Sequence, residues 1–294
     1  MMLTCLLACE KEKVDTPEFN VSVERQSYKV NDTVQFKISG RPDFITFYSG
    51  EDGNNYDYIT RTEAEGTSFF SFSSKTTSGS IPKQSNTLKL QYSVDFNGLY
   101  DAENVNKASW TDITNRAILT AGVVTTPSGN IDISDLRGNK GIHFAFKYTA
   151  EKSATLVQPT WVITNFIVDN YSPDGIKMPL VTNTNGGGWV SVGVVNAQNT
   201  PSVKWTVSSG GLTLNEGAVN ADPVEQWVIS KRINLSSVLP DKGVAIKTLN
   251  SDLDVHPHIY TKTGTYKVVF VAKNSNIYGE KEVIKQIIID VKED

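Results

Sequence analysis

Apolar and polar residues alternate along much of this chain, in short runs rich in β-branched and aromatic side chains. Such runs, bounded by glycine, asparagine, aspartate and proline, are typical of β-strands. The predicted strands are 19–23, 33–39, 44–48, 87–96, 141–149, 155–168, 189–195, 202–207, 227–229, 265–272 and 283–291. Long helical patterns are missing, and only short segments such as 102–108 could be helical. The pattern therefore predicts an all-β protein built from β-sandwiches.

The two ends of the chain are predicted to form one domain. Residues 18–61 contain about three strands, whose apolar faces and open edges have no partner in that segment. A half-sandwich of this kind needs a second layer and pairing strands. Residues 237–294 contain complementary strands, so residues 62–236 are expected to be an insertion at a loop, where chains accept whole domains.

The closing segment resembles the last hairpin of PKD domains. The resemblance rests on the order and spacing of Tyr260, Gly264, Thr265, Tyr266, Val268, Phe270 and Asn274. The stretch from Tyr28 to Gly40 is similar to the start of the same immunoglobulin-like family. PKD domains usually carry Trp-Asp-Phe-Gly-Asp-Gly after their third strand, and Phe47 to Gly53 replaces it here. The resemblance implies a discontinuous PKD/immunoglobulin-like β-sandwich made from both ends of the chain.

Residues 62–236 resemble a galactose-binding-like jelly roll. The similar segments are 88–98, 108–114, 129–136, 142–148 and 161–168, with a late Trp-Val-Ile-Ser sequence at 227–230. The resemblance implies an inserted jelly roll of the kind that is appended to bacterial surface proteins and adhesins.

The first residues resemble a bacterial lipobox. A short apolar run ends in Leu6-Leu7-Ala8-Cys9, and four charged residues follow at once. This order predicts that residues 1–8 are the remnant of a signal peptide, that Cys9 is acylated, and that residues 9–17 form a lipidated tether. Met1 to Ala8 contain no Lys or Arg, so we expect the natural start codon to lie upstream. The alternative is a cytosolic chain whose first residues are apolar by chance.

Taken in order, the lipobox, the PKD-like start, the jelly roll and the PKD-like close resemble DUF5017, a family of uncharacterised Bacteroidetes lipoproteins. The resemblance implies a protein that is lipid-anchored in the outer membrane, exposed at the cell surface and encoded with glycan-uptake systems. It does not imply an enzymatic activity.

Composition and charge restrict the partners and the chemistry. The 294 residues carry a net charge of −4, which argues against a nucleic-acid partner. Cys5 and Cys9 are the only cysteines. Because Cys5 leaves with the leader and Cys9 would be acylated, the mature body is expected to have no thiol for a disulfide or a zinc site.

Catalytic groups form no specific constellation, so we predict that the protein is not an enzyme. The sequence has no Gly-x-Ser-x-Gly elbow, and the mature body is expected to have no free cysteine. Asp254, His256 and His258 would share one face of an extended strand as a possible metal site, but Pro257 would interrupt that strand. His143 lies in an apolar run and is expected to be a hydrogen-bonded core or interface residue. A glycoside-active enzyme is less favoured, because a carboxylate pair arises by chance among 32 acidic residues.

Three turn regions contain the aromatic, amide and carboxylate side chains that bind carbohydrates, namely 50–58, 169–171 and 183–189. Aromatic rings stack on sugar faces, and amides and carboxylates pair with sugar hydroxyls. The candidate glycan-binding residues are Trp189, Tyr171, Asn170, Tyr56 and Tyr58. For each region the alternative is a solvated turn whose aromatic side chain has only a packing role. Four other tryptophans lie within strand patterns and are predicted to be core: Trp110, Trp161, Trp205 and Trp227.

A structural calcium ion is a further possibility, since jelly rolls of this type often hold one. Asp95, Asp101 and Glu103 supply oxygen ligands on one turn, which are the donors that Ca²⁺ prefers. Their spacing matches no recognised calcium loop, and an ordinary acidic turn is the favoured alternative. Apart from this ion, the sequence indicates no cofactor.

The sequence thus predicts a non-catalytic, cell-surface lipoprotein that binds glycans or mediates adhesion in connection with polysaccharide uptake. The alternative is a structural or protein-binding component of an outer-membrane complex, in which the sandwiches act as spacers and docking surfaces. The expected partners are a glycan or a surface protein, together with the membrane through the lipid on Cys9.

Overall fold

The computed structural model describes residues 13–77, 79–120, 122–139, 141–173, 175–196 and 203–293. Within these residues the protein is all-β, as predicted, and α1 (Ala102–Lys107) is the one α-helix. Four 3₁₀ turns accompany it: η1 (Tyr56–Tyr58), η2 (Thr114–Arg116), η3 (Ser134–Leu136) and η4 (Thr184–Gly187). A search of the same residues for a helix long and apolar enough to cross a bilayer found none.

The chain divides into two compact units. Unit 1 contains the described residues of Met1–Thr62 and Leu239–Asp294, and unit 2 contains those of Glu63–Val238. These boundaries lie within two residues of the expected ones at 61/62 and 236/237. Unit 1 is therefore built from both ends of the chain, and unit 2 from its middle.

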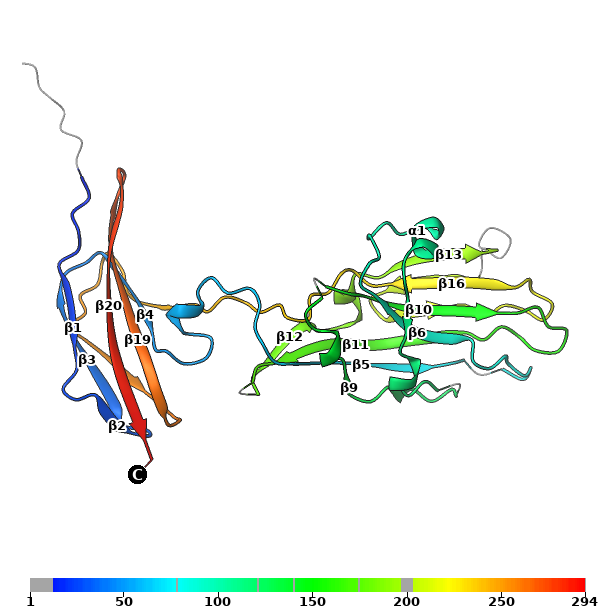
Figure 1. The fold of residues 1–294 in the computed structure, drawn as a ribbon, viewed down its shortest axis with the longest axis horizontal. Coiled ribbons are helices and arrows are strands. Elements are labelled where there is room, and N and C mark those ends of the chain that lie inside the picture. The colour runs from blue at the N-terminus through cyan, green and yellow to red at the C-terminus, as the bar shows by residue number, and fades with distance from the viewer. Residues whose placement is uncertain are drawn as a thin grey trace, which may run out of the picture. The chain divides into compact units, whose positions relative to one another are not determined.

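Unit 1 has two sheets (Figure 1). The smaller sheet consists, in order, of β1 (Phe19–Ser22), β3 (Thr33–Gly40) and β18 (Val255–Ile259). The larger sheet consists, in order, of β17 (Val244–Lys247), β4 (Phe44–Tyr48), β19 (Gly264–Asn276), β20 (Gly279–Lys292) and β2 (Ser27–Lys29). β2 is parallel to β20, and the other pairs are antiparallel.

An aromatic cluster fills the space between these two sheets. Along β3 every second residue is buried, which turns Val34, Phe36 and Ile38 inward. Phe270 of β19 is fully buried, with its ring centroid 5.2 Å from that of Phe36 and 5.1 Å from that of Phe47. Strands from the start and the end of the chain thus share one core, as expected if each end supplies half of one sandwich.

The structure corrects the expectation that Pro257 interrupts a strand. Pro257 lies in the middle of β18, opposite Gln35 of β3. β18 is the outermost strand of its sheet, so the missing proline N–H can face away from β3 without breaking a ladder bond.

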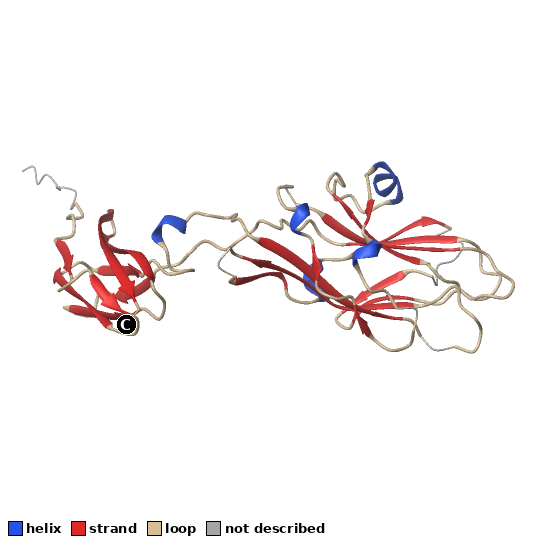
Figure 2. Ribbon diagram, turned by 60° about the horizontal axis from the view of Figure 1, so that its bottom comes forward, coloured by secondary structure: helices blue, strands red, loops and turns tan. Residues whose placement is uncertain are grey.

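Unit 2 also has two sheets, and Figure 2 shows their strands in two layers. One sheet consists, in order, of β13 (Val190–Val195), β16 (Val224–Ile229), β10 (His143–Ala150), β6 (Leu88–Ser93) and β7 (Thr111–Asp112). The other consists of β14 (Trp205–Ser208), β15 (Gly211–Leu214), β11 (Trp161–Tyr171), β5 (Thr67–Lys75) and β8 (Thr126–Pro127), with β12 (Lys177–Val181) beside β11 and β9 (Ile131–Asp132) beside β5.

Strand β10 is buried on both of its faces. Phe144, Phe146 and Tyr148 belong to the main core of unit 2, together with residues of β5 and β11. Ala145 belongs to a second cluster on the outer face, where Val105 of α1 packs near Trp227. The largely apolar segment 142–146, all of which is buried, reflects this double burial.

The chain enters and leaves unit 2 at neighbouring positions. Glu63 pairs with Ser237 in an isolated antiparallel bridge, and Ala64 N donates to Ser236 O at 3.0 Å. The two ends of the 63–238 segment therefore lie side by side, which is the geometry expected of an inserted unit.

Candidate functional site

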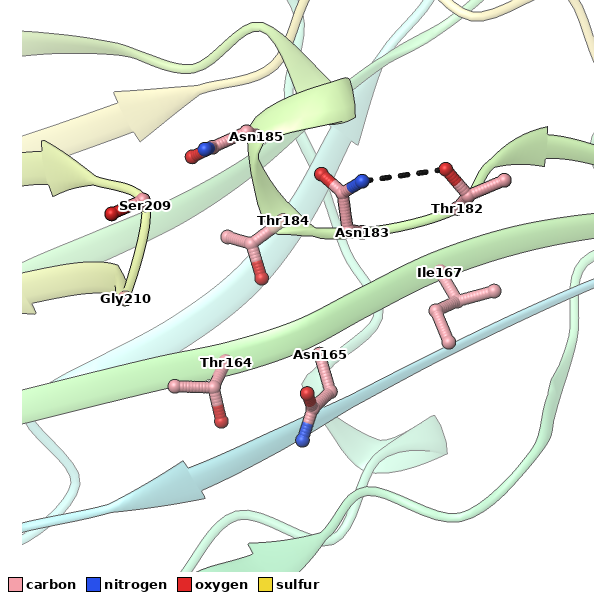
Figure 3. A pocket seen from close by; sticks show the side chains of 9 residues that line it. All are labelled: Thr164, Asn165, Ile167, Thr182, Asn183, Thr184, Asn185, Ser209 and Gly210. Carbon is pink, nitrogen blue, oxygen red and sulfur yellow. Dashed lines mark hydrogen bonds between the residues drawn. The ribbon is translucent and has the colours of Figure 1, made fainter.

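A polar pocket of about 360 Å³ lies on unit 2 (Figure 3). Strand β11 forms its floor, the η4 loop one side and the turn between β14 and β15 the other. The lining residues are Thr164, Asn165, Ile167, Thr182, Asn183, Thr184, Asn185, Ser209 and Gly210. This pocket includes part of the 183–189 loop that the sequence singled out.

A bulge in β11 shapes the floor of the pocket. The pairing of β11 with β5 shifts register between Thr164 and Ile167, and Asn165 has a φ of 54°. Asparagine is one of the few residues that adopt this left-handed conformation readily. Thr184 Oγ1 accepts a hydrogen bond from Phe166 N at 3.1 Å, which ties the η4 loop to the bulged strand. The bulge and the loop are therefore one local structure.

Side-chain capping holds the η4 loop in place. Asn183 Oδ1 accepts from Gly186 N at 3.0 Å, and Gly188 N donates to Asn185 O at 3.0 Å. Gly188 then reverses the chain with a φ of 60°. The reversal leads the backbone into β13 and directs Trp189 into the core.

Replacing Gly187 by alanine is expected to destabilise unit 2 by about 1–3 kcal/mol through overpacking. A Cβ at this position would overlap the indole ring of Trp189, which the core holds rigidly. Gly186→Ala is the matched control, since its Cβ would meet Val181 at 3.4 Å, an ordinary contact. Urea denaturation followed by tryptophan fluorescence measures both variants. Equal midpoints for the two would contradict the argument.

The pocket lining is polar and uncharged. Eight of the nine lining residues offer amides, hydroxyls or glycine backbone, and none of the nine is ionisable. The side chains of Asn165 and Asn185 are exposed and make no hydrogen bond within the described part of the chain. Each amide offers two N–H donors and a carbonyl acceptor. The pocket therefore suits a neutral ligand rich in hydroxyl groups.

The structure corrects the expectation that the 183–189 loop presents Trp189. The indole is only 6% exposed and packs against Phe166, at 4.9 Å between ring centroids, and against Phe146, at 5.5 Å. Its Nε1 is buried without a hydrogen-bond partner. The ring is a core residue beneath the loop, and its faces are not open to a sugar.

Asn170 and Tyr171 lie further along β11, outside the pocket lining. Asn170 is fully buried, and its Oδ1 accepts from Ser68 Oγ at 2.6 Å and from Arg137 Nη1 at 3.1 Å. Tyr171 is half-buried, edge-on to Phe69 at 5.8 Å. Asn170 is thus engaged in an internal network, whereas Tyr171 keeps part of its ring exposed.

Tyr56 and Tyr58 lie in unit 1, on η1, whereas the pocket residues belong to unit 2. The ring of Tyr56 is half-buried and edge-on to Tyr48 at 5.2 Å. Tyr58 is 43% exposed, and the guanidinium carbon of Arg61 lies 4.0 Å from its ring centroid. One face of Tyr58 is therefore covered by Arg61.

The three candidate calcium ligands each have a local partner. Asp95 accepts from Ser93 Oγ at 2.8 Å and from Ser109 N at 2.9 Å, and these bonds lower the pKa of its carboxyl group. Asp101 caps α1 by accepting from Asn104 N, and Glu103 pairs with Lys107 one turn on. Among the described residues no group of three metal-ligating side chains was found. These contacts account for the acidic turn as a structural element.

The histidines occupy structural positions. His143 is buried in unit 2 and its Nδ1 lies 2.8 Å from Ser230 O, which agrees with the predicted hydrogen-bonded core residue. In unit 1, the ring of His256 packs edge-on to Phe47 at 4.5 Å, and His258 Nε2 contacts Glu51 Oε2 at 2.9 Å. The ring of His256 thus has an aromatic neighbour, and that of His258 a carboxylate neighbour, within unit 1.

Unit 2 is expected to lose stability as the pH falls from 7 to 5. Burial lowers the pKa of His143, so below about pH 6.5 the unfolded chain binds a proton that the folded chain does not. His143 is the only histidine between residues 63 and 238, and all five tryptophans lie there too. Urea midpoints from tryptophan fluorescence should therefore fall over this range, and less so in His143→Gln. His256→Gln, in unit 1, is the control, and an unchanged slope in His143→Gln would refute the assignment.

Two parts of the pocket were not predicted from the sequence. Asn165 falls within the predicted strand 155–168, and Ser209-Gly210 lie outside the predicted strands and outside the three candidate binding regions. An asparagine that interrupts the apolar pattern of a strand is a signal of a bulge, and it could have indicated Asn165. The Ser209-Gly210 turn comes close to the η4 loop through tertiary packing, which the sequence of either segment does not reveal.

The fold and the pocket define an all-β protein with two sandwich units and a neutral polar surface site. The chain belongs to the family described as "Domain of unknown function (DUF5017)", whose sequence model matches residues 8–189, more than half of the chain. The matched range includes the pocket residues of β11 and η4 but ends before Ser209 and Gly210. Comparison with curated proteins and with solved structures found no match.

Proposed function

We propose that this protein is a non-catalytic, cell-surface lipoprotein that binds a neutral glycan in the pocket of unit 2. The observation that carries the proposal is the lining of the pocket, which consists mainly of amides and hydroxyls and contains no ionisable side chain. Sugar hydroxyls both donate and accept, and so do the free amides of Asn165 and Asn185. Ile167 supplies an apolar surface against which a sugar C–H face can pack.

The residue types that line the pocket determine how it would bind a glycan. Its lining holds no aromatic ring within the described residues, so recognition would depend on hydrogen bonds to a rigid frame. The bulge in β11 and the caps of η4 fix the backbone positions from which Asn165 and Asn185 project. Preorganisation of this kind lowers the entropic cost of binding. Moderate affinity with strong dependence on ligand geometry is the expected behaviour.

Screening a glycan array with the full mature chain tests the proposal. For any glycan bound, Asn185→Ala is expected to weaken binding about tenfold or more, because buried hydroxyls of the ligand lose their partner. Asn165→Gly is the second variant, since glycine removes the amide and keeps the positive φ. Asn215→Ala, an exposed asparagine outside the lining, is the control.

Two outcomes would overturn the proposal. One is silence across the array, which together with co-purification of a partner protein would favour the alternative role as a docking component. The other is binding that both pocket variants leave intact, which would place the glycan elsewhere.

The family and the first residues support the cellular part of the proposal. Cys9 lies outside the described residues, and its lipobox-like context is a property of the sequence alone. We assign the protein to the outer membrane through a diacylglycerol on Cys9, with unit 1 as a PKD-like sandwich and unit 2 as a galactose-binding-like jelly roll. Mass spectrometry of the protein extracted from its native membranes should show an acylated Cys9 as the first residue, and an unmodified Cys9 would refute this part.

A further inference from the structure

The end of the β19–β20 hairpin projects beyond the rest of the larger sheet of unit 1 (Figure 1). Strand β4 stops pairing with β19 at Lys273, whereas β19 and β20 continue to pair as far as Asn276 and Gly279. All residues from 275 to 282 are exposed, and we call this segment the hairpin tip. It is a two-stranded extension without a layer above or below it.

The two residues at the turn of the hairpin tip are apolar or aromatic. Ile277 is 90% exposed and Tyr278 is 48% exposed. Two-residue hairpin turns normally use asparagine, aspartate or glycine, because these residues adopt the turn backbone easily and are well solvated. Here Asn276 supports the turn by accepting from Tyr278 N at 2.8 Å, and Gly279 follows it. The asparagine and the glycine that such turns favour thus flank this turn, and an exposed isoleucine and an exposed tyrosine occupy its two central positions.

The start of the described chain is attached to the same end of this hairpin. Asn274 Nδ2 donates to Asp15 O at 3.1 Å, and Asn274 Oδ1 accepts from Asp43 N at 3.0 Å. Asp15 is the sixth residue after Cys9, so the two lie at most roughly 20 Å apart. Ile277 is the third residue after Asn274, just beyond the end of β19, which places it roughly 10 Å further along the hairpin. A lipid on Cys9 would therefore hold the bilayer surface within reach of the hairpin tip.

We infer that Ile277 and Tyr278 dock into the interface of the membrane to which Cys9 is anchored, so that lipid and hairpin tip form a two-point attachment. The inference rests on the proposed acylation of Cys9. An isoleucine paired with a tyrosine suits the headgroup boundary, where one side chain is buried and the other keeps its hydroxyl in water. Residues 273–282 contain two lysines and two glutamates, and Lys273 pairs with Glu280 at 2.9 Å. Because this end of the hairpin is neutral, its attachment depends on apolar burial and is insensitive to salt.

The experiment tethers residues 9–294, with Cys9→Ser, to phosphatidylethanolamine/phosphatidylglycerol vesicles through a hexahistidine tag and a nickel-chelating lipid. An environment-sensitive NBD dye on Ser275→Cys reports on the hairpin tip. With the tag at the N-terminus, emission should rise about twofold or more, as for a probe entering the interface, and should do so equally at high salt. With the tag at the C-terminus, emission should stay at its aqueous value, because β20 carries the chain roughly 45 Å away from the tip.

Two controls make the result specific. The same dye on Val244→Cys, an exposed position in β17, should not respond to either tether. The double variant I277S/Y278S, labelled at residue 275, should lose the rise. Equal emission with the two tethers, or a rise that survives the double variant, would overturn the inference. Since the tag replaces the lipid, failure here is independent of whether Cys9 is acylated, which the mass of the native protein decides.

Discussion

Phe270→Ala should strongly destabilise unit 1 and leave the stability of unit 2 unchanged. The Phe270 ring is fully buried and packs against Phe36, Phe47 and Phe19, so its removal leaves a large cavity at the centre of the unit 1 core. Such truncations typically cost about 3–5 kcal/mol. A small domain has a free energy of unfolding of about 5–15 kcal/mol, so the loss is a large share of the total.

The distribution of tryptophans allows the two units to be followed separately. All five tryptophans lie between residues 63 and 238, so their fluorescence reports on unit 2 alone, whereas far-UV circular dichroism reports on both units. In Phe270→Ala the circular dichroism transition should split or shift to lower denaturant, with the fluorescence transition unchanged. Ile288→Ala, on the exposed side of β20, is the control. A parallel shift of both signals would show that the two units unfold as one.

Arg137→Ala is expected to reduce the stability of unit 2 by about 2–4 kcal/mol. The Arg137 guanidinium donates to Leu235 O at 2.7 Å, to Ser68 Oγ at 2.7 Å and to Ala64 O. It also donates to Asn170 Oδ1, so it joins two strands of the sheet to the segments where the chain enters and leaves the unit. Without the guanidinium these acceptors lose a charged donor, and several of them are buried.

Two variants test whether the geometry of the guanidinium matters. Arg137→Lys keeps the charge but supplies one compact donor group in place of a planar fork, so it should recover only part of the loss. Arg116→Ala removes an exposed arginine that pairs with Asp135 at 2.7 Å, and it should cost less than about 1 kcal/mol. Urea denaturation followed by tryptophan fluorescence measures all three. Equal losses in Arg137→Ala and Arg116→Ala would contradict the role of the network.

The strand pattern predicted much of the fold, because burial on one or both faces leaves a direct trace in the sequence. Residues 44–48 were predicted with the bounds that the structure has, and the α-helical segment at 102–108 is also present. Strand β5 was missed. It contains four serines, and two of them, Ser68 and Ser74, are fully buried, so its polar composition hides a central strand. Buried hydroxyls that are satisfied by neighbours cannot be recognised from residue type alone.

The candidate site was harder to predict than the fold. The sequence indicated the 183–189 loop but placed its chemistry on Trp189, because an exposed aromatic ring is the usual platform for a sugar. In the structure Gly187 lets the loop close over the indole, and the asparagines of the loop remain outside. Which residues of a glycine-rich loop face inward depends on the shape of the core below it. By contrast, Trp161, Trp205 and Trp227 are buried as the strand pattern predicted.

The antiparallel bridge between Glu63 and Ser237 also bears on how such proteins can change over time. A segment whose two ends meet can be exchanged for another by recombination, provided that the two ends of the replacing segment are equally close. The sandwich of unit 1 then needs only a loop whose two ends lie at that same distance. Unit 1 therefore has the geometry of a host domain, and residues 63–238 have the geometry of a segment that can be moved as a whole.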